Sequence, residues 1–447
     1  MRGQVDFTKD SIVKSLIIFS APIIFGELLQ NFYNSVDALV VGNFIGDAAL
    51  AAVGVCGQIA TLFVNFFNGM SVGSSVVVAQ RFGKNNAVAI ERAICDAFTF
   101  ATLLGVVLSV AGIFGTPLLL KFAGTLPDYY AEAETYLRIY LAGLMFTVVY
   151  NSGAGILRAL GDSRTPFRIL IIACIGNIIA DFLLVAVFSM GIAGAGLATV
   201  LSQSYSTVAV YCAIRKKTGK RCLNVDELIC LGSGTVKEIL SIGISAGLQS
   251  ALIALSNIFV IRFLNHFDTI AVAGVGIAQR LDKFIVLPVK SFGITMTTYV
   301  SQNHGAEKYE RIRNGKNKCI LISLVTTAVI SLFVYIFAEE CVSLFNNNPK
   351  VIAIGVSMMQ VFIPLLSAVT IREILLGILR GYGKTTLPMI LSLIGMVGCR
   401  QVFLAISMSR NPIIENIYYC YPVAWLATII LLSGYYFAVK KKLKGLE

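Results

Sequence analysis

The 447-residue sequence contains few charged residues, and this scarcity excludes a soluble protein of this size. Only 13% of the residues are charged, whereas 57% are hydrophobic, and the mean hydropathy is +0.80. Apolar stretches of roughly 20 or more residues, separated by short polar segments, are typical of membrane-spanning helices. The stretches are too long for membrane-spanning strands and lack their alternation. The composition therefore predicts an all-α integral membrane protein.

Motifs for catalysis, metal binding and nucleotide hydrolysis are also missing. There are only two histidines, and the ten cysteines are scattered without a Cys-x-x-Cys pair, so neither a zinc site nor a redox site is expected. The sequence has no complete Gly-x-x-x-x-Gly-Lys-Ser/Thr phosphate loop, which argues against an ATP-driven motor. We therefore expect no enzyme activity and no cofactor, and an ion gradient as the energy source.

Twelve apolar stretches are long enough to cross a bilayer, and they divide evenly between the two halves of the chain. We predict an N-terminal six-helix lobe over residues 1–214, a cytoplasmic linker over residues 215–235 and a C-terminal six-helix lobe over residues 236–447. The predicted spans are residues 12–41, 50–80, 93–115, 131–157, 167–188 and 193–214 in the first half, and residues 236–263, 272–302, 318–338, 350–378, 387–408 and 416–439 in the second.

Two motifs recur at one fixed offset, which indicates an internal duplication. Residues 79–83 (AQRFG) reappear at 301–305 (SQNHG), and residues 155–158 (GILR) reappear at 377–380. Both pairs are separated by the same distance along the chain, which we call the repeat offset. An even number of spans separates the copies, so they lie in the membrane with the same orientation, as parallel repeats. Secondary transporters are often built from such repeats around a central cavity, with the substrate site between them.

The distribution of Lys and Arg predicts the orientation in the membrane. Most of the 36 basic residues fall in segments on one side, which also contains both chain ends, and only Lys121, Arg262, Lys350 and Arg410 fall on the other. Because basic residues stay on the cytoplasmic side, both termini are expected in the cytoplasm of a cell with a bacterial-type plasma (inner) membrane. This topology, with attraction to anionic lipid heads, also explains the net charge of +12, and no nucleic-acid partner is expected.

Charged and polar residues inside the predicted helices are the candidates for a functional site, because each is costly in the membrane and normally faces a cavity or a partner. The strongest candidates in the first half are Asp37 and Asp181. Asn177 precedes Asp181 by one helical turn, so both project from the same face of their helix. Asn151 and Thr199 add polar groups in the same half.

The acidic residues are absent from the second copy of the repeat. At the repeat offset, Asp37 corresponds to Phe259 and Asp181 to Phe403. A residue that serves packing is expected in both copies, whereas an ion site can be confined to one copy. The alternative to an ion site is a structural role, in which the two carboxylates orient their helices through hydrogen bonds. Burial favours the protonated form of a carboxylate, but the same oxygens also suit sodium. The sequence leaves both ions open, and no other metal is predicted.

The second half contains a different set of polar residues. Glu373 is the counterpart of Asn151 and is a candidate ion or substrate ligand; the alternative is an ion pair with Arg400, Lys290 or its neighbour Arg372. We predict a possible second polar site from the following residues: Gln249, Asn257, Lys290, Glu373 and Arg400.

The order and spacing of several motifs resemble those of the multidrug and toxic compound extrusion (MATE) transporters over essentially the whole chain. The first-half carboxylates resemble those of the prokaryotic DNA-damage-inducible subgroup. The motifs lie at residues 37–42 (DALVVG), 49–54 (ALAAVG), 79–83, 158–166, 177–181 and 191–199.

The resemblance implies an exporter of organic, often cationic and amphipathic, compounds that works by alternating access against inward flow of protons or sodium. By motif match, Asp37 and Asp181 are the coupling carboxylates, with Asn177, Asn151 and Thr199 around them. Pro22 matches a proline at which helix bending is proposed, and a proline removes one helical hydrogen bond. We expect small-molecule substrates and a lipid bilayer as the partners of the protein, and a monomer as its oligomeric state.

Two alternatives remain open from the sequence. A lipid-linked oligosaccharide flippase of the same superfamily would need several basic residues in its cavity, and Lys290 and Arg400 are too few to favour it. A membrane enzyme or a receptor is the remote alternative, because no nucleophile–base set and no sensory domain are visible.

Overall fold

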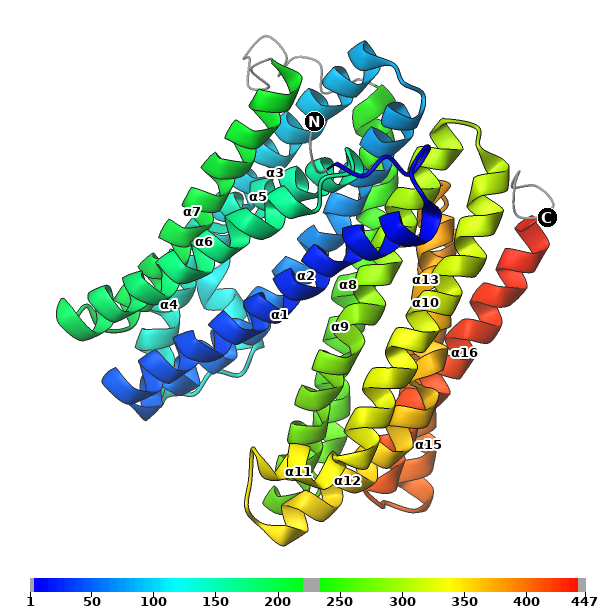
Figure 1. The fold of residues 1–447 in the computed structure, drawn as a ribbon. Helices are drawn as coiled ribbons and strands as arrows, with labels where there is room; N and C mark the ends of the chain where they lie inside the picture. Colours follow the sequence, from blue (N-terminus) through cyan, green and yellow to red (C-terminus); the bar gives the residue numbers. More distant parts are fainter. Residues whose placement is uncertain (1–3, 220–233, 441–447) are drawn as a thin grey trace. The chain divides into compact units, whose positions relative to one another are not determined.

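The structure is a computed structural model that describes residues 4–219 and 234–440 (Figure 1). Every regular element in this part of the chain is helical. The first half contains α1 (Ile12–Phe44), α2 (Asp47–Gly83), α3 (Ala87–Phe122), α4 (Tyr130–Ala142), α5 (Leu144–Ala159), α6 (Arg164–Asp181) and α7 (Gly191–Thr218). The second half contains α8 (Gly234–Leu264), α9 (Thr269–Gly305), α10 (Tyr309–Ile336), α11 (Ala338–Ser343), α12 (Pro349–Phe362), α13 (Leu366–Gly381), α14 (Thr386–Leu393), α15 (Arg400–Arg410) and α16 (Glu415–Lys440).

The helices of the described residues correspond to the predicted spans in position, and most of them are long and apolar enough to cross a membrane. Over the described residues, ten helices are long and apolar enough to cross a membrane, or eleven when the bent pair α4 and α5 counts as one span. Helix α9, at the position of the span predicted over residues 272–302, is not among them. The span predicted over residues 131–157 is not straight, because its two parts meet at 44°. The bend lies at Gly143, where an added Cβ would lie 2.5 Å from the side chain of Val200 on α7.

The duplication predicted from the two motifs extends to the helix ends. Helices α2 and α9 are related by the repeat offset at both ends, and so are α5 and α13. Helices α6 and α14 begin at positions with the same offset. The repeat is therefore a repeat of structure as well as of short motifs.

The chain forms two compact units, and each unit takes one segment from the other half of the sequence. The first unit comprises Met1–Val5 and Ala21–Gly247, and the second comprises Asp6–Ser20 and Leu248–Glu447. The chain thus changes unit within α1 and again within α8, the counterpart of α1 in the second repeat. Pro22 lies two residues after the change within α1.

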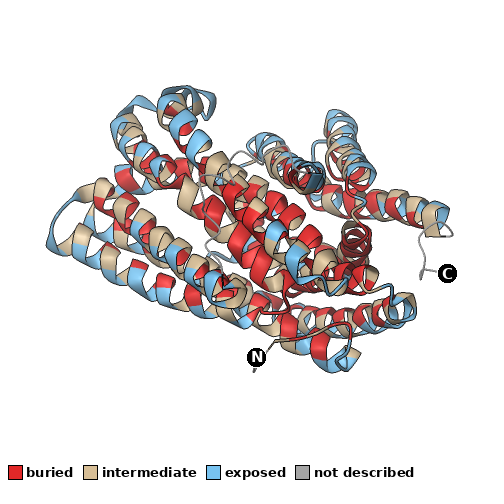
Figure 2. Cartoon of the chain, turned by 90° about the horizontal axis from the view of Figure 1, so that it is seen from above, coloured by how far each residue is buried: buried red, intermediate tan, exposed pale blue. Residues whose placement is uncertain are grey.

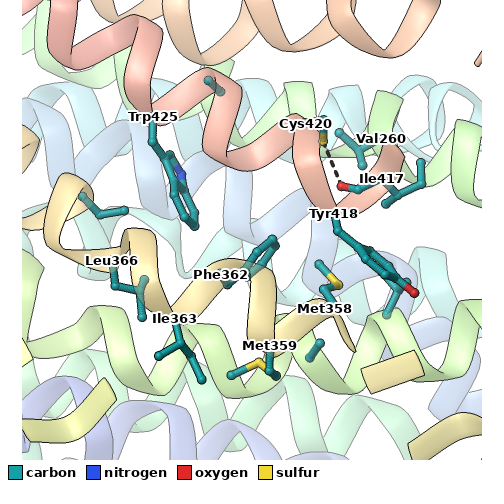
Figure 3. Packing of buried hydrophobic residues seen from close by; sticks show 14 of the residues in the cluster. Val260, Met358, Met359, Phe362, Ile363, Leu366, Ile417, Tyr418, Cys420 and Trp425 are labelled. Carbon is teal, nitrogen blue, oxygen red and sulfur yellow. Dashed lines mark hydrogen bonds between the residues drawn. The ribbon is translucent and has the colours of Figure 1, made fainter. Parts of the chain in front are cut away.

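Apolar side chains lie both inside the units and on their lipid-facing surfaces. Many helices have one buried and one exposed side (Figure 2). In the second unit, Phe362 of α12 packs edge-to-face against Trp425 of α16, with ring centroids 5.4 Å apart (Figure 3). By contrast, Phe114 and Leu118 of α3 are 82% and 73% exposed. Their spacing of one helical turn places them on one face, as expected for a helix that contacts lipid.

Within the first unit, α2 and the first half of α8 approach each other at glycines. A Cβ added to Gly73 would collide with the carbonyl oxygen of Ile239, and one added to Gly69 would collide with the backbone of Ala246 and Gly247. Small residues at a helix interface allow the backbones to approach closely, which is a common way of packing helices in membranes.

Because of this close approach, we expect a glycine-to-alanine substitution to affect the melting temperature differently at two positions of α2. Gly73→Ala should lower the melting temperature in detergent, because the added methyl group forces the helices apart at a cost of about 1–3 kcal/mol. Gly54→Ala should leave the melting temperature unchanged or raise it, because no atom lies within 4 Å of the added Cβ and alanine is the better helix former. Equal melting temperatures for the two variants would contradict the packing described.

Candidate ion and substrate sites

The two acidic residues predicted for the first half lie together in the first unit. Asp37 on α1 is 8% exposed, and Asp181 at the end of α6 is fully buried. Their carboxyl groups interact directly, and no cation is among the groups that interact with either one. Oδ1 of Asp37 and both carboxyl oxygens of Asp181 form no hydrogen bond within the described structure. The pair is therefore buried, adjacent and without a compensating positive charge.

Asn177 extends this polar group by one turn of α6. The residue is 1% exposed, and neither atom of its amide forms a hydrogen bond within the described structure. Buried polar groups normally find partners. A side-chain amide that lies one turn from an unpaired carboxylate can offer its oxygen to a cation or its nitrogen to a carboxylate.

Tyrosines surround the acid pair. Tyr33 of α1 and Tyr136 of α4 both interact with Asp37, and Tyr136 stacks on Tyr140 with ring centroids 6.4 Å apart. Sequence reasoning did not single out these tyrosines, although Tyr33 precedes Asp37 by one helical turn. Aromatic walls exclude water, which strengthens electrostatic interactions at the site.

The other two residues predicted for this half are less closely involved. Thr199 of α7 is 6% exposed, and its hydroxyl donates a hydrogen bond to the carbonyl oxygen of Ala195 at 3.2 Å. Asn151 of α5 is half-buried, and its amide forms no hydrogen bond with either carboxyl group in the described structure. The structure therefore brings Asp37, Asp181 and Asn177 together, whereas the hydroxyl of Thr199 is held by its own helix.

A π-helical segment adjoins the polar residues in each half, which the sequence did not reveal. In the first half this segment covers Phe182–Val187, directly after Asp181. In the second half it covers Ile394–Cys399, directly before Arg400. Such segments are frequent at functional sites. Their positions are not related by the repeat offset, so the two copies differ here.

The polar residues of the second unit form ion pairs and hydrogen bonds. Glu373 of α13 pairs with Arg372, the third of the partners considered from the sequence, at 2.7 Å between a carboxyl oxygen and Nη2. Arg400 of α15 is 1% exposed and donates hydrogen bonds to Asn257 at 2.8 Å and to Ser256 at 2.6 Å. No carboxylate of the described residues forms an ion pair with Arg400. Lys290 of α9 is exposed.

The repeated GILR motif ties α5 and α13 to the first helix of their own half. In the second unit, Nη2 of Arg380 donates a hydrogen bond to Oε1 of Gln249 at 3.0 Å. In the first unit, the counterpart Arg158 interacts with Glu27, the counterpart of Gln249. The partner on the first helix is acidic for Arg158 and neutral for Arg380, and Arg380 also interacts with Glu373 of its own helix.

The turn after α5 contains a second motif residue, Asp162. Gly161 has a φ of 82°, in the left-handed region that favours glycine. Asp162 accepts hydrogen bonds from Thr165 at 2.9 Å and 2.7 Å and pairs with Lys217 of α7 at 2.7 Å. Burial alone would raise the pKa of Asp162, but the bonds from Lys217 and Thr165 outweigh it and hold this pKa below its ordinary value.

Duplicated spanning helices and buried charges at membrane depth define a multi-pass membrane protein of the transporter class. Comparison with known families gives the identity: a sequence profile of the MatE family matches residues 22–183 and, a second time, residues 246–406. The chain therefore belongs to the MatE family. Members of this family are membrane transporters rather than enzymes.

Individual proteins agree with this assignment over the full length of the chain. The probable multidrug resistance protein YoeA of Bacillus subtilis is 28% identical over 97% of this chain and 96% of its own length. The probable multidrug resistance protein YpnP of the same organism is 29% identical over 90% of this chain and 89% of its own. A crystal structure of MATE in complex with MaD3S has a TM-score of 0.88, with 21% identity over 99% of this chain and 100% of that one, and so shares the fold.

The Asp162 turn predicts a pH-dependent contribution to stability. A depressed pKa in the folded state stabilises the fold at pH values above the unfolded pKa, and this stability is lost as the pH falls through the folded pKa. Asp162→Asn should therefore lower the melting temperature at pH 7, and the difference from the wild type should shrink below the ordinary pKa of 3.8. Asp128→Asn, at an exposed position, is the control and should change nothing. A pH-independent difference for Asp162→Asn would refute the prediction.

Proposed function

We propose that this protein exports amphipathic organic compounds in exchange for protons or sodium ions, and that Asp37 and Asp181 bind the coupling ion. The observation that carries the proposal is the burial of two adjacent carboxyl groups that lack a cationic partner. Two close carboxylates cannot both be charged in such a place without a large cost. A proton or a sodium ion removes that cost, so the pair is suited to bind one reversibly.

Coupling requires that the ion bind two conformations with different affinity. Asp37 lies on α1 and Asp181 at the junction of α6 with a π-helical segment, so ion binding changes the charge between two helices. A change in charge there alters how α1 packs against α6. Pro22, near the position where α1 passes from one unit to the other, is the proposed hinge for the resulting bend.

The names of the relatives support the type of substrate. YoeA and YpnP are described as probable multidrug resistance proteins, and an exporter of small organic compounds is the corresponding function here. We further propose a monomer in a bacterial-type inner membrane. The distribution of Lys and Arg supports the placement of both termini in the cytoplasm. Asn151 and Thr199 are proposed as outer contributors to the ion site.

Neutralising the acid pair predicts loss of coupled transport without loss of folding. In proteoliposomes, the wild type should transport a fluorescent organic dye under a proton gradient or a sodium gradient. The gradient that drives transport identifies the coupling ion. Asp37→Asn and Asp181→Asn should reduce transport to the level of empty liposomes. Their melting temperatures should stay unchanged or rise, because a buried neutral amide costs less than a buried charge.

Asp47→Asn serves as the control, because Asp47 is exposed at the start of α2; it should transport like the wild type. Gradient-driven transport that persists in the Asp37→Asn/Asp181→Asn double variant would rule out the proposed ion site. Absence of dye transport by the wild type under both gradients, together with movement of a labelled lipid-linked sugar, would instead favour the flippase alternative.

A further inference from the structure

Lys290 is a charged residue deep within a spanning helix. At 1.5 Å per residue it lies about 32 Å along α9 from Thr269 and about 22 Å from Gly305, so its side chain is too short to reach either end. The side chain is exposed, and it forms no ion pair or hydrogen bond within the described structure. A lysine at such a depth normally faces a water-filled cavity or a ligand.

The surroundings of Lys290 in the second unit carry more positive than negative charge. Asp282 interacts with Lys290, Arg372 and Lys283, and Glu373 interacts with Arg372, Arg380 and Lys290. Four cations thus surround two acids, and only Arg372 and Glu373 form an ion pair. Arg380 donates a hydrogen bond to the neutral amide of Gln249. The cluster therefore has an excess of positive charge that the protein itself does not balance.

Comparison of the repeats shows that the scaffold does not require this charge. At the repeat offset, Lys290 corresponds to Asn68, Lys283 to Thr61 and Arg372 to Tyr150. Gln249 replaces Glu27, so the second copy loses an acid where the first copy has one. Cations that served to pack α9 and α13 would be expected in both copies, because α2 and α5 have the same bounds at this offset. Arg380 has a counterpart in Arg158, but the confinement of Lys290, Lys283 and Arg372 to one copy indicates a ligand.

We propose that Lys290, supported by Arg380 and Arg372, binds the acidic group of an amphipathic organic substrate, so that the exported compounds include organic anions and zwitterions. The inference rests on the proposed export function and narrows its substrate class. The occupant is a soluble organic anion rather than a lipid, because Lys290 lies far from both helix ends, whereas lipid headgroups lie at the membrane surface.

The chemistry of the cluster suits this ligand. Lysine is a compact, mobile point charge that can approach carboxylate, sulfonate or phosphate oxygens, and charge-assisted hydrogen bonds are stronger than neutral ones. Phe284, which follows Lys283 on α9, is 44% exposed and offers an apolar surface on the same helix. An apolar lining with a few charged groups is typical of small-molecule sites.

Two xanthene dyes of similar size and opposite charge, fluorescein and rhodamine 6G, test the proposal. Binding to purified protein is measured by fluorescence anisotropy, and transport of each dye is measured in proteoliposomes. Lys290→Gln should weaken fluorescein binding about tenfold, as expected for the loss of a charged hydrogen-bond donor. Lys290→Arg should restore fluorescein binding in part, because it restores the charge.

Gln249→Glu is a second variant that tests charge without removing a contact. It introduces the acid that the first repeat has at the same position, so Arg380 keeps its partner while its charge is balanced. Fluorescein binding should again weaken, and the melting temperature should not fall. Lys350→Gln, at an exposed position at the start of α12, is the matched control and should bind both dyes like the wild type.

The outcomes separate this inference from the proposed function. Transport of rhodamine 6G without any binding of fluorescein would overturn the inference and leave the export function intact. Fluorescein affinity that is equal in the wild type and Lys290→Gln would also overturn it. The inference would also be overturned if Lys290→Gln changed only the amount of phosphatidylglycerol that the purified protein retains. That result would identify a lipid headgroup as the ligand. If neither dye is transported but fluorescein still binds, the result would contradict the proposed export function and not the inference about Lys290.

Discussion

The high cost of a charge in the bilayer interior governs where the charged side chains of this protein lie. Apolar residues such as Phe114 face outward, so hydrophobicity alone does not distinguish the core of a unit from its surface. The buried charged residues do make that distinction. Arg400 receives two polar partners from α8, and Glu373 receives Arg372. Asp37 and Asp181 have no such compensation, which is why they are the strongest candidates for reversible ion binding.

The duplicated scaffold is used with opposite polarity in the two copies. The first copy carries the unpaired acids, whereas the second carries the excess of cations around Asp282 and Glu373. The two copies share the bounds of α2 and α9 and of α5 and α13, and the left-handed glycines Gly161 and Gly383. They also share the interaction of the GILR arginine with the first helix of its half. The shared features thus belong to the fold, and the differences between the copies mark the places where function has been added.

The sequence predicted the spans, the repeat and the acid pair because each rests on a strong local signal. Long apolar runs set the helices, and two motifs at one offset set the repeat. Asp37 and Asp181 were found because any carboxylate inside such a run is conspicuous. Asn177 followed from its spacing of one turn from Asp181.

Features that depend on packing between distant helices were not predictable in the same way. The bend lies at Gly143, where α7 leaves no space for a side chain because Val200 is close, and neither residue alone signals it. The π-helical segments lack a sequence signature. The cation cluster was underestimated, because Arg380 lies beyond the end of the span predicted over residues 350–378 and Arg372 was considered only as a partner of Glu373. The replacement of Glu27 by Gln249 between the repeats was the available signal.

The most direct test of the central claim is infrared difference spectroscopy of the carboxyl groups in the purified protein, recorded on a change of pH and on addition of sodium. If Asp37 and Asp181 bind the coupling ion, the wild type will show a change in a buried carboxyl band under one of these conditions, and Asp181→Asn will lack it. An identical band change in the wild type and in the Asp37→Asn/Asp181→Asn double variant would show that the ion binds elsewhere.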